Sequence, residues 1–386
     1  MKLLDLCRIS NKRVEDTNPF CFWLVDGYKL DNKHLVMWYE KQFQTTASFV
    51  YRDLALLKTN LQDTQIDLNI DYHLEFLKRL RRENKSVKLM YSGGTDSATV
   101  LDIAHRHQMA IDETITLIIQ DIDLASNTEQ KNIVLPGLEK YKSVIQKATQ
   151  VTYNYDDIEE HFNDRYAFFS GPCDAVVPVG FTAAKYTALS RYYNDKDTCI
   201  ISGIDKPQIL LYNGKWYATC IDNPVAWGDQ SIPNLVPFYM DARNIKGYLK
   251  DCILFRDHLT EKGEVNDNYL QFFQPDQSKE HTDVLQRLQI QGEQLGGKFS
   301  TNNEKTLLRF KECFGHNRFT TLIKYFNAMQ TFYDIFPEAK TEQGLEQYNR
   351  NGKFAWFIDL DTLKVHTQGE LIPNGFKKTA KIGNFQ

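Results

Sequence analysis

Residues 87–97 read VKLMYSGGTDS, and this stretch decides the fold of the chain. Its first five residues form a short apolar run after a charged segment, which predicts a buried strand. Beyond Gly93-Gly94, apolar residues recur at helical spacing and predict a helix: Ala98, Val100, Leu101 and Ala104. Glycines allow a tight turn and a close approach of a ligand to the backbone, because no Cβ atoms stand in the way. The sequence therefore predicts a strand-to-helix turn built on these two glycines.

This turn has the chemistry of a phosphate site. N–H groups at a helix N-terminus point outward and, together with the helix dipole, favour an anion. The hydroxyls of Ser92, Thr95 and Ser97 add hydrogen-bond donors. Asp96 would repel a phosphate, but a bound Mg²⁺ resolves the conflict because hard cations take carboxylate and phosphate oxygens together. We therefore expect a magnesium and phosphate site, and the simpler alternative is a ligand-free Gly-Gly turn capped by Thr95 or Asp96.

The run Ser92-Gly93-Gly94-Thr95-Asp96-Ser97 resembles the PP-loop of the N-type ATP pyrophosphatases, a superfamily that includes asparagine, GMP and NAD synthetases. It is not a Walker A loop, because no Lys follows Gly94. The resemblance covers about residues 80–210. It implies an α/β fold with a parallel doubly wound sheet of the PP-loop (HUP) type. It also implies ATP and Mg²⁺ as cofactors, adenylation of a substrate oxygen and release of pyrophosphate.

Three further apolar runs predict more strands of this sheet: Thr114–Ile119, Thr149–Tyr153 and Cys199–Ile201. In a doubly wound sheet the ligand crevice lies at the carboxyl ends of the strands. The resemblance accordingly assigns the adenine ring to the backbone at the end of the second strand: Ile119, Gln120 and Asp121.

The turn after the fourth strand resembles the second phosphate-binding element of the same superfamily. It runs Ser202-Gly203-Ile204 and then presents Asp205 and Lys206. An ammonium group there would neutralise charge on the transferring phosphates, so Lys206 and Asp96 are the expected catalytic residues. A surface turn with solvated charges is the alternative. An Asn213-Gly214 pair between two alternating runs then predicts a hairpin.

Three parts of the chain are expected: an N-terminal β-containing module over 1–65, the PP-loop domain over 66–224 and a mainly helical C-terminal region over 225–386. In the first part, the apolar runs Cys21–Val25 and Leu35–Tyr39 predict paired strands. An amphipathic helix is predicted over 71–84. Helical spacing also marks three C-terminal segments: Asn244–His258, Thr282–Leu295 and Thr306–Gln330.

Composition limits the compartment and the partners. Seven scattered cysteines indicate reduced thiols and a cytoplasmic protein, and the absence of a CxxC pair argues against zinc or iron–sulfur sites. No run approaches the roughly 20 apolar residues of a membrane helix. The net charge of −4 does not call for a nucleic-acid partner, although it leaves one possible.

The leading expectation is an AMP-forming ligase that transfers an adenylated group to an amine or ammonia, similar to asparagine synthetase. Class II glutaminase domains begin with a Cys after the initiator Met, whereas this chain has Lys2, so no glutaminase is expected. One alternative is nucleobase modification in tRNA or DNA, and another is a non-catalytic nucleotide-binding interaction protein. The acceptor and the oligomeric state have no recognisable signature.

Two cysteines leave further alternatives open. Cys173, in a loop rich in glycine and proline, is either a nucleophile or sulfur carrier, as in the thiolating members of the superfamily, or a buried structural residue. The segment Cys313-Phe314-Gly315-His316 is faintly similar to the Cys-Gly-His ending of phosphoadenylylsulfate reductases, but the inserted Phe314 and the internal position argue against that function.

Overall fold

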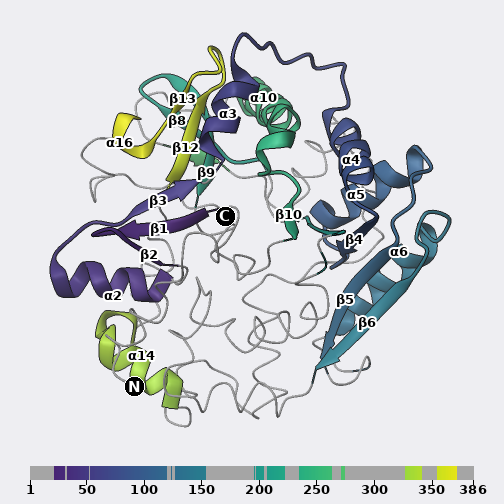
Figure 1. The fold of residues 1–386 in the computed structure, drawn as a ribbon, viewed down its shortest axis with the longest axis horizontal. Coiled ribbons are helices and arrows are strands. Elements are labelled where there is room, and N and C mark those ends of the chain that lie inside the picture. The colour runs from purple at the N-terminus through teal and green to yellow at the C-terminus, as the bar shows by residue number, and fades with distance from the viewer. Residues whose placement is uncertain are drawn as a thin grey trace.

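The computed structural model describes residues 21–30, 33–51, 53–119, 123, 127–153, 195, 197–203, 207–221, 234–262, 271–273, 327–340 and 354–371. Within these ranges the strands form three sheets, and helices pack around them (Figure 1). No helix among the described residues is long and apolar enough to cross a membrane.

The sheet that carries the sequence motif is parallel throughout. Its strands, in spatial order, are β10 (Leu235–Pro237), β7 (Thr198–Ser202), β4 (Ser86–Met90), β5 (Glu113–Ile119) and β6 (Ala148–Tyr153). The chain starts at β4, adds β5 and β6 on one side, and then returns to add β7 and β10 on the other. The order therefore reverses between β4 and β7, as it does in doubly wound sheets. The predicted α/β class and parallel sheet are confirmed.

The strands of this sheet differ in burial, because edge strand β6 exposes Ala148, Gln150 and Thr152 whereas central strand β7 is covered on both faces. All five residues of β7 are buried, as expected for a central parallel strand. The flanking helical elements are α4 (Tyr72–Glu83), α5 (Thr95–Arg106), a π-helical turn η2 (Gln130–Val134) and α6 (Leu135–Lys140). A further helix, α10 (Ile245–Lys262), packs against α4. Helix α10 confirms the helical spacing that begins at Asn244.

Helix α4 follows its amphipathic pattern. Asp71 caps it by accepting a hydrogen bond from the backbone N–H of Leu74 at 3.0 Å. The predicted inward face is confirmed, because its apolar residues are buried: Leu74, Phe76, Leu77 and Leu80. His73 is buried with them, which the sequence did not indicate.

A second sheet of five strands is antiparallel. Its order is β11 (Gln271–Phe273), β8 (Ile209–Tyr212), β9 (Lys215–Ile221), β12 (Phe354–Asp359) and β13 (Val365–His366). The predicted hairpin is confirmed as β8 and β9. Asn213 and Gly214 make its turn with positive φ angles of 50° and 72°, which is the geometry of a two-residue hairpin.

The N-terminal module is a three-stranded antiparallel sheet with two helices. Its elements are β1 (Cys21–Val25), β2 (Tyr28–Leu30), α2 (Lys33–Phe43), β3 (Ser48–Tyr51) and α3 (Leu54–Leu61). The prediction that Leu35–Tyr39 is a strand was wrong, because this run lies inside α2. Five apolar residues do not distinguish a strand from a buried helical segment by periodicity. The strands that pair with β1 are β2 and β3.

The described part of residues 225–386 is helical in places and also contributes strands. Besides α10, it contains α14 (Asn327–Ile335), α16 (Gln368–Leu371) and the short 3₁₀ helices η6 (Ala242–Asn244) and η7 (Pro337–Lys340). The expectation of a mainly helical region is corrected by β10, β11, β12 and β13. Strand β10 contains Pro237, which is tolerated because the strand lies at the edge of its sheet.

The three expected parts of the chain share one core. A single hydrophobic cluster includes Trp23 of β1, Leu89 of β4, Tyr248 of α10 and Trp356 of β12. Tyr248 packs edge-on against Trp356, with ring centroids 5.9 Å apart. Strand pairing and packing therefore cross the expected boundary at residue 224.

Candidate functional site

The loop between β4 and α5 depends on Gly93. Its φ angle is +75°, a conformation that side chains other than glycine rarely adopt. A Cβ atom on this residue would also lie 2.8 Å from Cγ2 of Val134, at the end of η2. Conformation and space therefore both require glycine here, and the loop packs directly on the helical turn that follows β5.

The serine hydroxyls organise the loop from within. The Ser97 hydroxyl is buried; it accepts from the Ser92 N–H at 3.3 Å and donates to the Gly94 carbonyl at 3.1 Å. The Gly94 N–H lies 3.4 Å from the Ser92 hydroxyl oxygen. The Ala98 N–H donates to the Gly94 carbonyl at 2.9 Å and makes an early backbone bond of α5. The N–H groups before it belong to the first turn, where a helix has no carbonyls of its own to offer.

Gly203 brings the end of β7 against this same turn. A Cβ atom at Gly203 would lie 2.8 Å from both the Cα and the N of Ser97, and 3.0 Å from the carbonyl carbon of Asp96. Backbone atoms cannot move aside as a flexible side chain would, so only glycine fits. The ends of β4 and β7 thus meet at the point where the strand order reverses. In open α/β sheets this position is where ligands bind.

Tyr91 anchors the loop on its other side. Its N–H donates to the Ile115 carbonyl at 2.9 Å, and its own carbonyl accepts from the Thr116 hydroxyl at 3.0 Å. Its side chain is buried over Gly137, where a Cβ atom would overlap the phenol oxygen. Burial raises the pKa of the Tyr91 phenol above its usual range. The loop is therefore tied to β5 and α6 as well as to β7.

Tyr239, which follows β10, contacts the first turn of α5. Its hydroxyl donates to the backbone carbonyl of Asp96 at 3.0 Å. Burial raises the pKa of Tyr239 well above its usual range, and the negative charges of Asp96 and Asp251 raise it further. The phenol therefore stays protonated and remains a donor at physiological pH.

A buried polar cluster lies next to Tyr239. His73 of α4 forms an ion pair with Asp251 of α10, with 2.8 Å between Nε2 and Oδ2. The Asn244 amide nitrogen lies 3.0 Å from His73 Nδ1 and donates to the Phe238 carbonyl at 2.7 Å. Burial alone would lower the pKa of His73, but the charge and hydrogen bond of Asp251 outweigh it and raise the pKa above its usual value.

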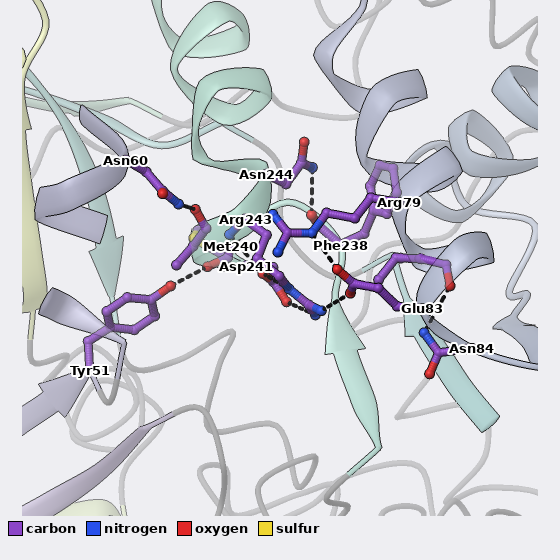
Figure 2. Close-up of polar contacts among 12 residues, drawn as sticks. Tyr51, Asn60, Arg79, Glu83, Asn84, Phe238, Met240, Asp241, Arg243 and Asn244 are labelled. Atoms are coloured by element: carbon purple, nitrogen blue, oxygen red, sulfur yellow. Dashed lines mark hydrogen bonds and ion pairs between the residues drawn. The ribbon is translucent and has the colours of Figure 1, made fainter. Parts of the chain in front are cut away.

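Charged residues gather where the end of α4 meets the segment of η6 (Figure 2). Arg243 donates to both carboxylate oxygens of Asp241, at 2.8 and 2.7 Å, and to Glu83 at 2.9 Å. Arg79 donates to the other oxygen of Glu83 at 2.6 Å. Burial would raise the pKa of Glu83, but the two arginines hold it below its usual value. We refer to Arg79, Glu83, Asp241 and Arg243 as the charged clamp.

The structure brings six of the predicted site residues together at one strand-to-helix turn: Ser92, Gly93 and Gly94 before α5, and Thr95, Asp96 and Ser97 in its first turn. Ile119 ends β5 at the same edge of the sheet. The other predicted positions lie outside the described residues: Gln120, Asp121, Asp205 and Lys206, with Cys173 and Cys313.

Asp96 fits a magnesium ion that is held partly by phosphates. Magnesium is usually bound through one or two carboxylates plus substrate phosphates and water, rather than by an all-protein cage. No group of three or more His, Cys, Asp or Glu side chains that could hold a metal ion occurs in the described part of the chain.

Sequence reasoning missed Tyr239 and the close contact made by Gly203. The signal for Tyr239 was the apolar run around Pro237, which is too short to identify as a strand. Neither a protein-family model nor a curated protein matches this sequence.

Proposed function

We propose that this chain binds ATP with Mg²⁺ at the Ser92–Ser97 loop and acts as an ATP pyrophosphatase of the PP-loop type. The observation that carries the proposal is the contact of Gly203 with the Asp96–Ser97 peptide. It joins a glycine-rich helix N-terminus to the end of β7 at the switch point of a parallel sheet. The strand order and the six-residue motif both support a sheet of the PP-loop type.

Each loop group has a role in this proposal. The first-turn N–H groups of α5, with the Ser92 hydroxyl, would bind phosphate oxygens. The buried Ser97 hydroxyl would support the loop through its bond to the Gly94 carbonyl. Asp96 would hold Mg²⁺, which neutralises charge on the departing pyrophosphate. From the resemblance, the backbone at Ile119, Gln120 and Asp121 would bind adenine.

The second phosphate element would complete the site. Asp205 and Lys206 follow Gly203 by two and three residues in the sequence. The Lys206 ammonium would stabilise negative charge as the α–β bond of ATP breaks.

The reaction would form an acyl- or imidoyl-adenylate and then an amide or amidine. A substrate oxygen attacks the α-phosphorus and pyrophosphate leaves. An amine or ammonia then attacks the activated carbon, and AMP leaves with the oxygen. We propose an asparagine-synthetase-like ligase without a glutaminase, acting in the cytoplasm. The described residues Cys199 and Cys252 are buried thiols outside disulfides, which agrees with a reducing compartment.

Product analysis tests this proposal. ATP labelled at the α- or the γ-phosphate is incubated with the protein, Mg²⁺ and pools of carboxylates, amines, tRNA and DNA. The expected products are AMP and pyrophosphate, and the pool that stimulates their formation identifies the acceptor class. ADP and phosphate as main products would contradict the PP-loop assignment. Binding without turnover in every pool would instead indicate a nucleotide-binding interaction protein.

A further inference from the structure

The peptide group between Asp96 and Ser97 is contacted from two separate parts of the chain. Gly203, after β7, packs against its carbon and nitrogen atoms. Tyr239, after β10, donates a hydrogen bond to its oxygen at 3.0 Å. A carbonyl oxygen has two lone pairs, so it can accept this bond in addition to a bond within the helix.

The orientation of this peptide matters for the loop. In a trans peptide the C=O and N–H groups point in opposite directions. Fixing the Asp96 carbonyl toward Tyr239 therefore fixes the Ser97 N–H in the other direction, toward the start of α5. That N–H belongs to the turn that would bind phosphate.

Tyr239 is itself held rigidly. It is 3% exposed, and its ring lies edge-on to His73 and to Phe238, with centroids 5.4 and 5.3 Å apart. A hydrogen bond with Thr99 engages its hydroxyl from α5 as well. The hydroxyl thus has little freedom to leave the Asp96 carbonyl.

We propose that Tyr239 is a positioning residue for nucleotide binding, because its hydroxyl orients the Asp96–Ser97 peptide of the phosphate-binding loop. This inference rests on the proposed function. It predicts that loss of one hydroxyl, far along the chain from the motif, weakens nucleotide binding while the fold persists.

Tyr51→Phe provides a matched control. Tyr51 is 2% exposed, and its hydroxyl donates to the carbonyl of Met240 at 3.0 Å. Figure 2 shows the bond from Tyr51 to Met240. Met240 directly follows Tyr239, so both variants remove a phenol-to-carbonyl bond beside the same short segment. Tyr51→Phe leaves the loop contact intact.

The test compares the wild type, Tyr239→Phe and Tyr51→Phe by two measurements. The first is hydrogen exchange of residues 92–101 without nucleotide, and the second is ATP–Mg²⁺ affinity by calorimetry. We expect Tyr239→Phe to speed exchange in this segment and to weaken affinity roughly 3- to 10-fold, the scale of one hydrogen bond. Tyr51→Phe should leave both close to wild type even where it lowers the melting temperature.

Two results would overturn the inference: unchanged exchange and affinity in Tyr239→Phe, or equal losses of affinity in the two variants. The second result would mean that both tyrosines act only on general stability. If the wild type bound no nucleotide at all, the proposed function itself would fail. The role of Tyr239 in nucleotide binding would fail with it, and faster exchange in Tyr239→Phe would then mark a purely structural bond.

Discussion

The Ser92–Ser97 loop and the charged clamp are held together by different means. At the loop, Gly203 and Tyr239 contact the backbone of the Asp96–Ser97 peptide. In the clamp, Arg243 pairs with Asp241 and Glu83 through side chains. The charges of the clamp pair with one another, whereas the N-terminus of α5 at the loop favours an anion. A ligand is therefore expected at the loop, and stability is the expected role of the clamp.

Of the variants at the loop, Gly203→Ala should have the largest effect on ATP–Mg²⁺ affinity. The added Cβ would overlap backbone atoms of Ser97, so α5 and β7 must separate and the first-turn N–H groups lose their arrangement. We expect ATP–Mg²⁺ affinity to fall by roughly 10³-fold, about 4 kcal/mol, measured by calorimetry.

Gly214→Ala is the control for this variant, because a Cβ there meets nothing within 4 Å although its φ is +72°. It should retain nucleotide affinity and lose only hairpin stability. Equal affinity in Gly203→Ala and the wild type would remove the phosphate site from this turn.

Asp96→Asn should have the second-largest effect. If the carboxylate holds Mg²⁺ against the phosphates, turnover to AMP should fall by roughly 10²-fold, the scale of losing one charge-stabilising group. The free energy of unfolding should change by at most about 1 kcal/mol, the value of one charge near a helix N-terminus. Steady-state kinetics and urea unfolding measure the two effects.

Asp102→Asn is the control for Asp96→Asn. Asp102 lies on the same helix and forms an ion pair with Arg106 at 2.9 Å, which this variant breaks. It should reduce stability without reducing turnover. Unchanged turnover in Asp96→Asn would exclude the metal role of that carboxylate.

Arg243→Met tests the charged clamp. It removes a bidentate pair with Asp241, which is 10% exposed, and leaves that carboxylate without the guanidinium. We expect a loss of roughly 2 kcal/mol in the free energy of unfolding, with unchanged ATP–Mg²⁺ affinity. A loss of affinity comparable to that of Gly203→Ala would show that the loop and the charged clamp do not have separate roles.

How much of this comparison could be predicted from the sequence depends on the distance over which each signal acts. The turn at Gly93, the strands around it and α4 were predicted because their apolar spacing lies within each element. Tyr239 and Asp96 are separated by 143 positions, and no local pattern links them. Strand β12 pairs with β9, matching Asp359 to Tyr217, so the second sheet was likewise outside the reach of periodicity. The strand predicted at Leu35–Tyr39 was wrong for a different reason, since a five-residue apolar run fits either a strand or a helix.

The pH dependence of the His73–Asp251 pair gives the smallest expected effect. The pKa of His73 is raised in the folded chain, so the pair stabilises fully below the unfolded pKa of about 6.5. That contribution is lost as the pH rises through the raised pKa. The difference in unfolding free energy between the wild type and His73→Gln should therefore be larger at pH 5.5 than at pH 9, as measured by urea titration. The half-buried His105, replaced by Gln, is the control. A difference that grew with pH would contradict the ion pair.

The most direct test of the central claim is hydrogen exchange with and without saturating ATP and Mg²⁺. The account predicts slower exchange at residues 92–98 and 201–203, where the loop meets the end of β7. Segments 79–84 and 241–244, which form the charged clamp, should exchange at the same rate in both conditions. Protection confined to the clamp, or no protection in any segment, would contradict a nucleotide site at the Ser92–Ser97 loop.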